Sequence, residues 1–398
     1  MSTTLLLAYN FPPHEGGIAR MMGELTRHFP PGALVVSTGT YPGSEAVDRA
    51  IPQTVDRVGV PARRLRTING LAAWTWRASS LARRLRPGFA WCGELKPAAY
   101  PARWLSARYG LPYGIVVHNS TELLLLQEKS RRSRFKRRMA RLLLDPASVV
   151  VAVSHWTADL ARSVLEEHGA LRLAQTVRVV QLGADPKHFR PGVDPQGVRT
   201  KFGLDGGPWL LTAARIQRVK GIDTVIKALP AVRAAFPGTR YAVAGAGPYR
   251  AEFEQLAARL GVADAVRFLG PVANDDLPGL YNAATLYVGA SRRVHDLNEG
   301  FPLAFIEASA CGLAIVGGRT GGVPEAVRDG ESGILVNSED PEAVAAGVKR
   351  LLGDDGLRRQ MGAAGRRRVE TYYNWDRVAR DLIRIDAEFR RQRPPVAR

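Results

Sequence analysis

Two glutamates with seven residues between them flank a segment that could bind a phosphate and a sugar together. The residues that follow the first glutamate, Glu299, are Gly300, Phe301, Pro302 and Leu303. An apolar helical pattern then leads to the second, Glu307. Proline suits the first position of a helix, and the next amide hydrogens stay free to meet an anion at the positive end of the helix dipole. Carboxylates can accept hydrogen bonds from sugar hydroxyls. An acidic turn that only stabilises the helix would explain Glu299 but not the other features.

A basic pair follows the apolar run 210–213. Arg215 can bind a diphosphate through its forked guanidinium, and Lys220 can bind it as a compact charge. Apolar residues at helical spacing begin at Ile222, so the pair lies between an expected strand and an expected helix. An isolated pair is more often solvated surface charge, so this interpretation depends on the neighbouring glutamates.

A glycine pair near the N-terminus offers another place for an anion. Gly16 and Gly17 follow the apolar run 5–8 and precede an amphipathic pattern that contains Met21 and Leu25. A strand, a glycine loop and a helix start let backbone amides approach a phosphate closely. The same glycines could instead serve a tight turn with positive φ.

The elements that must position these residues alternate between short apolar runs and helical patterns, which is typical of doubly wound parallel sheets. The chain has 398 residues, enough for two or three domains. We expect strands at 5–8, 33–37, 114–117, 149–153, 177–180, 210–213, 240–244, 266–269, 286–288, 314–316 and 333–336. This predicts an α/β chain with two Rossmann-like domains, over residues 1–190 and 191–371, that face a central cleft. Residues 372–398 contain a last helical pattern that could end the second domain or cross back to the first.

Charge is the unusual feature of the composition, since 56 Lys and Arg against 37 Asp and Glu leave a net charge of +19. The excess is concentrated in residues 129–144, which contain eight basic residues and no acidic one, with Phe135 and Met139 at helical spacing. The candidate surface residues are Arg131, Arg132, Arg134, Lys136, Arg137, Arg138 and Arg141. This pattern predicts either a basic amphipathic helix on an anionic membrane surface or a helix packed on its own domain with a solvated basic face.

Several other classes are disfavoured. No nucleic-acid module is recognisable, so we expect no specific nucleic-acid partner. Gly245 and Gly247 begin a Gly-x-Gly-x-x-Gly pattern, but Arg250 stands at its third glycine, which argues against an oxidoreductase. Cys92 and Cys311 lie far apart without metal-ligand spacing, so we expect no metal and a reducing, cytoplasmic setting. No signal peptide or apolar span is evident, so we expect any membrane contact to be peripheral, on the inner face of the plasma membrane.

These motifs occur in the order found in one family. The segment from Glu299 to Glu307 resembles the Glu-x7-Glu motif of retaining glycosyltransferases of family 4, which have the two-domain GT-B fold. The other matching motifs are Gly16-Gly17, Val153-Ser154-His155, Gly183-Ala184-Asp185 with Phe189, Arg215 with Lys220-Gly221, Gly245-Ala246-Gly247-Pro248, Phe268-Leu269-Gly270-Pro271-Val272, Thr320-Gly321-Gly322-Val323-Pro324-Glu325 and Asp329-Gly330. The resemblance extends from residue 5 to residue 390.

The resemblance implies a metal-independent hexosyltransferase whose substrate is a nucleotide diphosphate sugar and which uses no other cofactor. By similarity, Arg215 and Lys220 hold the diphosphate, and amides of residues 300–303 and of the Gly17 loop lie nearby. Glu307 would bind the ribose and Glu299 the donor sugar. The family also suggests that the departing phosphate helps to deprotonate the acceptor, and that the last helix crosses back to the first domain.

Two further positions follow from the resemblance. Val272 matches the residue that contacts the nucleobase through its backbone, and His118 matches a histidine beside the donor sugar. A buried histidine with a structural hydrogen bond is the alternative for His118.

The donor base and the acceptor stay open. Relatives that use GDP-mannose often have an aspartate two positions after the valine, where this chain has Asn274, and this difference favours UDP. The stretch 291–298 instead resembles mannosyltransferases that act on phosphatidylinositol-type lipids. The acceptor would be a glycan or a lipid-linked molecule. A nucleotide-sugar epimerase of similar architecture is the main alternative function, and a basic nucleic-acid-binding protein is a more distant one.

Overall fold

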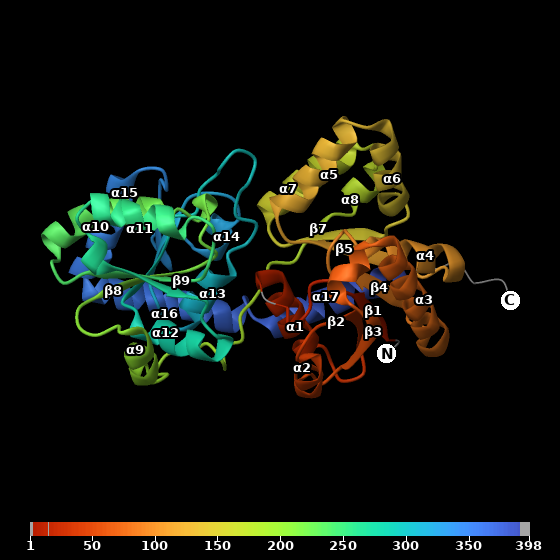
Figure 1. The fold of residues 1–398 in the computed structure, drawn as a ribbon, viewed down its shortest axis with the longest axis horizontal. Helices are drawn as coiled ribbons and strands as arrows, with labels where there is room; N and C mark the ends of the chain where they lie inside the picture. The colour runs from red at the N-terminus through yellow and green to blue at the C-terminus, as the bar shows by residue number, and fades with distance from the viewer. Residues whose placement is uncertain (1–2, 15, 391–398) are drawn as a thin grey trace. The chain divides into compact units, whose positions relative to one another are not determined.

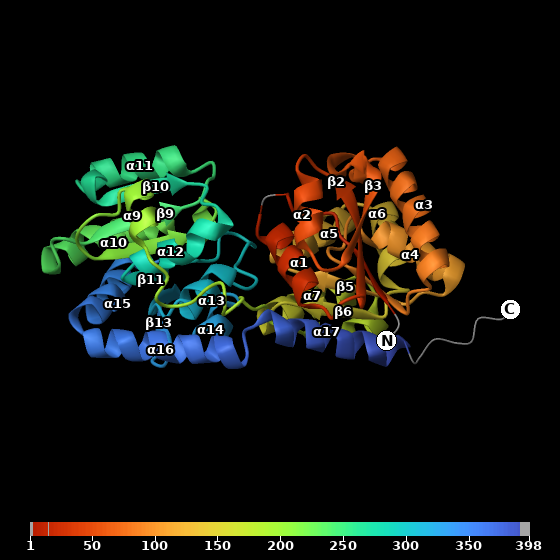
Figure 2. The same cartoon turned by 90° about the horizontal axis from the view of Figure 1, so that it is seen from below.

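The computed structural model describes residues 3–14 and 16–390, and these form two compact units. The first unit contains the chain up to Gln181 together with the last helix, α17 (Trp375–Arg390), and the second spans Leu182–Asn374. Each unit is a parallel sheet covered by helices (Figures 1 and 2). The chain changes units at 181/182 and 374/375, whereas the sequence predicted divisions at 190 and 371, nine residues later and three residues earlier.

The first unit is built on a seven-stranded parallel sheet with the order β3-β2-β1-β4-β5-β6-β7. Its strands are β1 (Thr4–Leu7), β2 (Leu34–Thr40), β3 (Thr54–Pro61), β4 (Phe89–Cys92), β5 (Tyr113–Val117), β6 (Val149–Ala152) and β7 (Arg178–Val179). The central strands are buried throughout and, apart from Thr4, carry no polar side chain that is not aromatic, as expected for a sheet covered on both faces. Neither β3 nor β4 was expected from the sequence.

The helices of the first unit connect these strands. They are α1 (Gly17–His28), α2 (Ser44–Ala50), α3 (Ile68–Leu85), α4 (Ala99–Tyr109), α5 (Ser120–Arg131), α6 (Arg134–Leu144), α7 (His155–Glu167) and α8 (Leu171–Gln175). The last helix, α17, packs beside α1. Thr4 donates a hydrogen bond of 2.7 Å to the buried carboxylate of Asp386, and His28 lies 2.8 Å from Asp376. These contacts tie the end of the described chain to the unit where it begins.

The basic segment is two helices rather than one, which corrects the sequence prediction. The chain leaves the helical conformation at Ser133, whose side chain caps α6 by accepting a hydrogen bond from the Lys136 amide at 3.3 Å. Ala140, Leu143 and Leu144 are buried against the unit, whereas Phe135 and Leu142 are exposed. The apolar residues of this segment are therefore divided between the core and the surface.

The second unit is a six-stranded parallel sheet with the order β10-β9-β8-β11-β12-β13. Its strands are β8 (Trp209–Ala213), β9 (Arg240–Ala244), β10 (Val266–Gly270), β11 (Leu286–Gly289), β12 (Ile315–Gly318) and β13 (Gly333–Val336). Its helices are α9 (Gln196–Phe202), α10 (Ile222–Ala235), α11 (Arg250–Arg259), α12 (Leu277–Ala283), α13 (Leu303–Ala310), α14 (Val323–Ala326), α15 (Pro341–Gly353) and α16 (Asp355–Thr371). All six strands lie where the sequence pattern predicts them.

Candidate active site

The loop after β8 carries the predicted basic pair. Arg215 is exposed, and no described residue forms a hydrogen bond or an ion pair with its guanidinium. Lys220 ends a single 3-10 turn and places its Nζ 2.5 Å from Oε2 of Glu299. Because an ammonium has three donors, Lys220 can hold this carboxylate and still bind a phosphate oxygen. The fold thus brings together two residues that are 79 positions apart in the chain.

A glycine allows the loops after β8 and β11 to meet. Gly221 has φ +63°, and a Cβ atom there would lie 1.7 Å from the carbonyl oxygen of Ala290. The amide of Arg292 donates to the carbonyl of Val219 at 2.9 Å, and its guanidinium forms two bonds of 2.9 Å with Asp223. These contacts fix the stretch 291–298 to the start of α10, and so fix the ends of the ion pair.

The backbone and side chain of Glu299 are held from several directions. The Ser291 hydroxyl donates to the carboxylate at 3.2 Å, and the Glu299 amide donates to Asn298 Oδ1 at 2.9 Å. The Glu299 carbonyl accepts from the Gly322 amide at 2.9 Å, and a Cβ on Gly321 would lie 2.2 Å from that carbonyl oxygen. The Gly-Gly motif after β12 is therefore required for packing against the loop that presents Glu299.

Helix α13 begins one residue later than predicted. Pro302 has φ −86° and ψ 90°, so it is the residue before the helix and not its first residue, because ψ lies outside the helical range. Leu303 and Ala304 are partly exposed, and among the described residues no backbone carbonyl accepts their amide hydrogens. Gly300 and Phe301 are buried and place these amides directly after Glu299. The helix start therefore keeps the free donors that an anion needs.

Glu307 lies inside α13 and is 4% exposed. The hydroxyl of Tyr281 donates to its Oε2 at 2.9 Å. Burial, with smaller contributions from the charges of Glu299 and Glu307, holds the pKa of Tyr287 well above its ordinary value. Both carboxylates thus act on one tyrosine at the carboxyl end of the sheet, where ligands of such folds bind.

The glycines after β9 have a structural explanation that does not involve a dinucleotide. A Cβ on Gly245 would lie 2.0 Å from the Ala214 carbonyl oxygen, and one on Gly247 would lie 2.2 Å from that of Ile216. These glycines let the loop after β9 pack against the loop that carries Arg215. The Gly245 amide also donates to the Gly270 carbonyl at 2.8 Å, and the partly buried Val272 follows in the next loop.

The glycine loop of the first unit is open. Gly16 has φ +124° and precedes α1, which begins at Gly17. A Cβ on Gly17 would meet no atom within 4 Å. Since packing in this unit does not require glycine at position 17, the open helix start is available to a ligand.

His118 follows β5 directly and is buried. Its Nε2 hydrogen-bonds to the carbonyl oxygen of Gly93, so Nε2 carries the proton. Its Nδ1 is buried and has no hydrogen-bond partner among the described residues. Burial lowers the pKa of His118 to about 4, despite the hydrogen bond to Gly93. The imidazole is therefore neutral at physiological pH, and Nδ1 can accept a hydrogen bond.

Two carboxyl groups beside His118 were missed in the sequence. Glu94 follows β4 and accepts hydrogen bonds from the Tyr9 amide at 2.5 Å and from the Asn10 side chain at 3.5 Å. Glu122 lies in the first turn of α5 and accepts from the Lys96 amide at 2.9 Å. Because β1, β4 and β5 are neighbours, residues that follow them meet at one edge of the sheet. The available signal was a set of polar residues after adjacent strands, but β4 itself was not expected.

Glu94 is buried and Glu122 is partly buried. Burial is the main cause that raises the pKa of Glu94 to about 8 and that of Glu122 to about 7. The neighbouring Glu122 charge adds to the shift of Glu94. Glu94 is therefore protonated in the folded protein near neutral pH. A carboxyl group in this form can donate a hydrogen bond as well as accept one.

We expect Glu94→Gln to flatten the pH dependence of stability. The native pKa lies above the unfolded one, so the native state holds the extra proton, and stability falls as pH rises from about 4 to about 8. The variant lacks this proton but can still accept the Tyr9 hydrogen bond, so it should gain about 5 kcal/mol relative to the wild type above pH 8. Urea unfolding at several pH values measures this gain. Equal slopes in the two proteins would contradict the buried, protonated carboxyl.

The basic segment 129–144, at the end of α5 and along α6, is partly neutralised by its own unit. Arg131 forms an ion pair with Glu167 at 2.7 Å, Arg132 with Glu128 at 3.0 Å, and Arg141 with Asp145 at 3.2 Å. Arg137 donates to the Glu167 carbonyl at 2.6 Å. The residues Arg134, Lys136 and Arg138 are exposed, and no described residue pairs with them.

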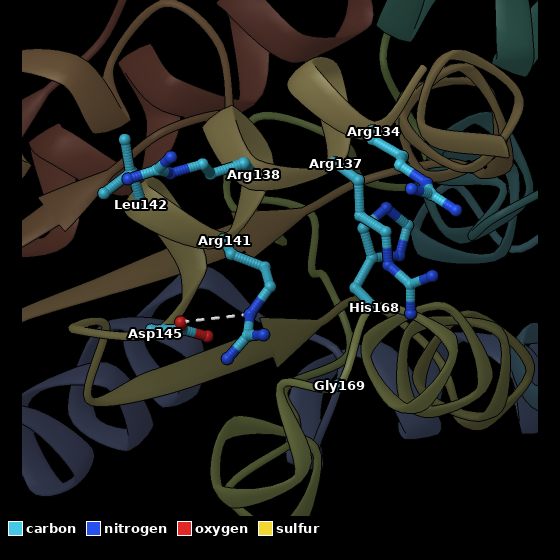
Figure 3. A pocket seen from close by; sticks show the side chains of 8 residues that line it. All are labelled: Arg134, Arg137, Arg138, Arg141, Leu142, Asp145, His168 and Gly169. Carbon is cyan, nitrogen blue, oxygen red and sulfur yellow. Dashed lines mark hydrogen bonds and ion pairs between the residues drawn. The ribbon is translucent and has the colours of Figure 1, made fainter. Parts of the chain in front are cut away.

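A pocket of about 370 Å³ lies beside α6 (Figure 3). Its lining residues are Arg134, Arg137, Arg138, Arg141, Leu142, Asp145, His168 and Gly169. His168 is buried, and its Nδ1 donates to the Val164 carbonyl at 2.7 Å. Its Nε2 has no partner among the described residues. The pocket therefore combines guanidinium groups with a buried imidazole nitrogen.

Within residues 3–14 and 16–390, no group of three or more His, Cys, Asp and Glu side chains is placed to hold a metal ion. In the same part of the chain, no helix has the length and apolarity needed to cross a bilayer.

Comparisons with known proteins agree with this arrangement. A family model described as "Glycosyltransferase Family 4" matches residues 15–188, and one described as "Glycosyl transferases group 1" matches residues 198–368. The crystal structure of Anabaena HepE in complex with UDP superposes with a TM-score of 0.75 at 19% identity, over 97% of this chain and 100% of that chain. WaaG, a glycosyltransferase involved in lipopolysaccharide biosynthesis, gives 0.66 at 16% identity, over 98% and 100%. At these identities the likeness shows the fold, which is that of the GT-B glycosyltransferases.

Sequence similarity to curated relatives shows the family to which the chain belongs. The chain is 30% identical over 409 residues to the GDP-mannose-dependent alpha-(1-6)-phosphatidylinositol monomannoside mannosyltransferase of Mycobacterium tuberculosis, covering 96% of this chain and 97% of that one. It is 37% identical over 227 residues to the D-inositol 3-phosphate glycosyltransferase of Salinispora arenicola, over 53% and 49%. The chain belongs to glycosyltransferase family 4, near the phosphatidylinositol mannoside mannosyltransferases.

Proposed function

We propose that this enzyme transfers mannose from GDP-mannose, with retention at the anomeric carbon, to a hydroxyl of a lipid-linked polyol. The ion pair between Lys220 and Glu299, beside the free amides of α13, carries the proposal. It joins a cation for the leaving diphosphate to a carboxylate for the sugar. The names of relatives that align with nearly the whole chain support GDP-mannose as the donor, although Asn274 replaces the usual aspartate.

The proposed reaction needs little covalent chemistry from the protein. The bond between the anomeric carbon and the phosphate oxygen breaks, and a bond to the acceptor oxygen forms on the same face of the sugar. The acceptor proton passes to the leaving phosphate. Arg215, Lys220 and the amides of Leu303 and Ala304 stabilise the charge on that phosphate, which is the type of electrostatic contribution that dominates such steps. No metal and no further cofactor take part.

The remaining site residues bind and orient the donor. Glu307 accepts hydrogen bonds from the ribose hydroxyls, and Glu299 accepts them from the mannose. The backbone at Val272 contacts the base. In the first unit, the free Nδ1 of His118 accepts from a sugar hydroxyl, and the Gly17 amide lies at a helix start that suits the phosphates.

Glu94 and Glu122 suit a polyol acceptor, because buried carboxyl groups bind hydroxyls with directed hydrogen bonds. The names of two groups of relatives refer to phosphatidylinositol monomannoside and to inositol 3-phosphate. We place the reaction in the cytoplasm, at the inner face of the plasma membrane. The free, buried thiols of Cys92 and Cys311 suit a reducing compartment.

A panel of nucleotides tests the donor. We expect GDP and GDP-mannose to raise the melting temperature more than UDP, ADP and their sugars, because a ligand that binds only the folded state stabilises it. Glu307→Gln should reduce the shift with every nucleotide. Glu254→Gln, which removes an exposed carboxylate of α11 paired with Arg250, is the matched control. No shift with any nucleotide would contradict the assignment, and a larger shift with UDP would reject GDP-mannose.

Incubation with the donor alone separates the transferase from an epimerase. A transferase needs an acceptor, so we expect intact donor and at most slow hydrolysis. An epimerised sugar formed without acceptor would contradict the proposal.

A further inference from the structure

Three helices of the first unit expose large apolar side chains. Trp76 of α3 is 69% exposed, Trp104 of α4 is 54% exposed and Phe135 of α6 is 71% exposed. Leu142, also of α6, is 46% exposed. Single exposed apolar residues are ordinary, but two exposed tryptophans on adjacent helices are not explained by the packing of this unit.

These helices form one surface. α3 packs against α4, and α4 packs against α6. The Arg103 side chain of α4 donates to the Leu142 carbonyl of α6 at 3.1 Å, and this hydrogen bond holds α4 and α6 together. Each helix connects parallel strands in the same direction across the sheet, so right-handed crossovers place all three on one face (Figure 1). We call the outward side of these helices the α3–α4–α6 face.

The three helices themselves carry charge of a single sign, and one of their arginines, Arg77, is paired with Asp56 of β3 at 2.5 Å. Within the ranges 68–85, 99–109 and 134–144 there are ten Arg and Lys residues and no Asp or Glu. The basic residues are Arg77, Arg83, Arg84, Arg103, Arg108, Arg134, Lys136, Arg137, Arg138 and Arg141. A basic surface with exposed indoles suits the interface of an anionic bilayer, where arginines bind phosphates and tryptophans lie at headgroup depth.

The pocket beside α6 adds a binding site at the edge of this surface (Figure 3). Its one acidic lining residue, Asp145, is already paired with Arg141. The guanidinium groups of Arg134 and Arg138 have no partner among the described residues. Nδ1 of His168 donates to the Val164 carbonyl, and its buried Nε2, which has no partner among the described residues, is left to bind a hydroxyl. A headgroup with a phosphate and a neighbouring hydroxyl matches both features.

We propose that the α3–α4–α6 face rests on an anionic lipid bilayer, with Trp76 and Trp104 in the interface and lipid phosphates in the pocket beside α6. The inference deepens the proposed action on a lipid-linked acceptor and rests on it. A nucleic acid would also meet the arginines, but the exposed Trp, Phe and Leu side chains on three helices without an acidic residue favour the bilayer. Vesicle binding requires no turnover, so its failure is distinguishable from failure of the proposed transfer.

The test measures co-sedimentation with vesicles of phosphatidylcholine alone and of phosphatidylcholine mixed with phosphatidylglycerol. We expect the wild type to prefer the mixed vesicles. The double variant Arg134→Gln, Arg138→Gln should bind them about fivefold less tightly for each arginine removed. The double variant Trp76→Ser, Trp104→Ser should bind less tightly at every composition and lose the blue shift of tryptophan fluorescence on binding.

The matched control is Arg259→Gln, Arg350→Gln, because both arginines are exposed in the second unit and have no partner among the described residues. It removes the same charge and should bind vesicles like the wild type. Thermal unfolding confirms that each variant is folded. No binding of the wild type, or equal loss in the control, overturns the proposal. Binding of duplex DNA through Arg134 and Arg138 with no vesicle binding also overturns it and identifies nucleic acid as the partner.

Discussion

Replacing Lys220 with methionine should lower the rate of sugar transfer by a factor of about a hundred to a thousand. The substitution removes a cation beside the departing diphosphate. In the wild type the Glu299 carboxylate lies 2.5 Å from the Lys220 ammonium, and the substitution leaves it without this ion-pair partner. The turnover number and the dissociation constant of GDP, measured separately, should show that turnover falls more than nucleotide affinity.

The adjacent Arg218 supplies the control for this substitution. It lies two residues earlier on the same turn, is exposed and pairs with Glu252 at 3.0 Å, away from Glu299. Arg218→Met should therefore change turnover little. Because Lys220 and Glu299 act as one unit, Glu299→Gln combined with Lys220→Met should cost less than the sum of the single losses. Unchanged turnover in Lys220→Met would remove this residue from the site.

The second unit could be predicted strand by strand because its strands are mainly apolar runs between polar helical patterns, including the partly exposed edge strand β10. The strands of the first unit were harder to predict from the sequence. β3 (Thr54–Pro61) is an edge strand that contains Asp56 and Arg57 and ends in proline, so it lacks the apolar signature. β4 is four residues long and follows a Pro-Gly pair, which reads as a turn. The polar residues of an edge strand concealed β3, and the preceding Pro-Gly pair concealed β4.

The site was predictable where function constrains local spacing. Glu299, Glu307 and the start of α13 lie within nine residues, and that spacing indicates their chemistry. Glu94 and Glu122 have no such spacing, since they meet only because β4 and β5 are adjacent. Likewise, residues 129–144 indicate an unbroken basic helix, but the Ser133 cap and the distant partner Glu167 divide and partly neutralise it.

Gly221→Ala should disrupt the candidate active site by displacing the loop after β11. Alanine at φ +63° costs about 1–3 kcal/mol in backbone strain alone. Its Cβ would also lie 1.7 Å from the Ala290 carbonyl oxygen, so the loop after β11 would have to move. That loop carries Ser291 and Arg292, which fix Glu299 and the start of α10. We therefore expect lower stability to urea together with a loss of nucleotide affinity of at least about tenfold.

Gly261 separates the two causes. It has φ +67°, close to that of Gly221, but a Cβ there would meet no atom within 4 Å. Gly261→Ala should therefore lose only the stability that backbone strain costs and should bind GDP like the wild type. The difference between the two variants measures the contact between the loops after β8 and β11. The opposite result would be an equal loss of stability in both variants with unchanged affinity for GDP. It would show that the close approach of Gly221 to Ala290 does not position Lys220 against Glu299.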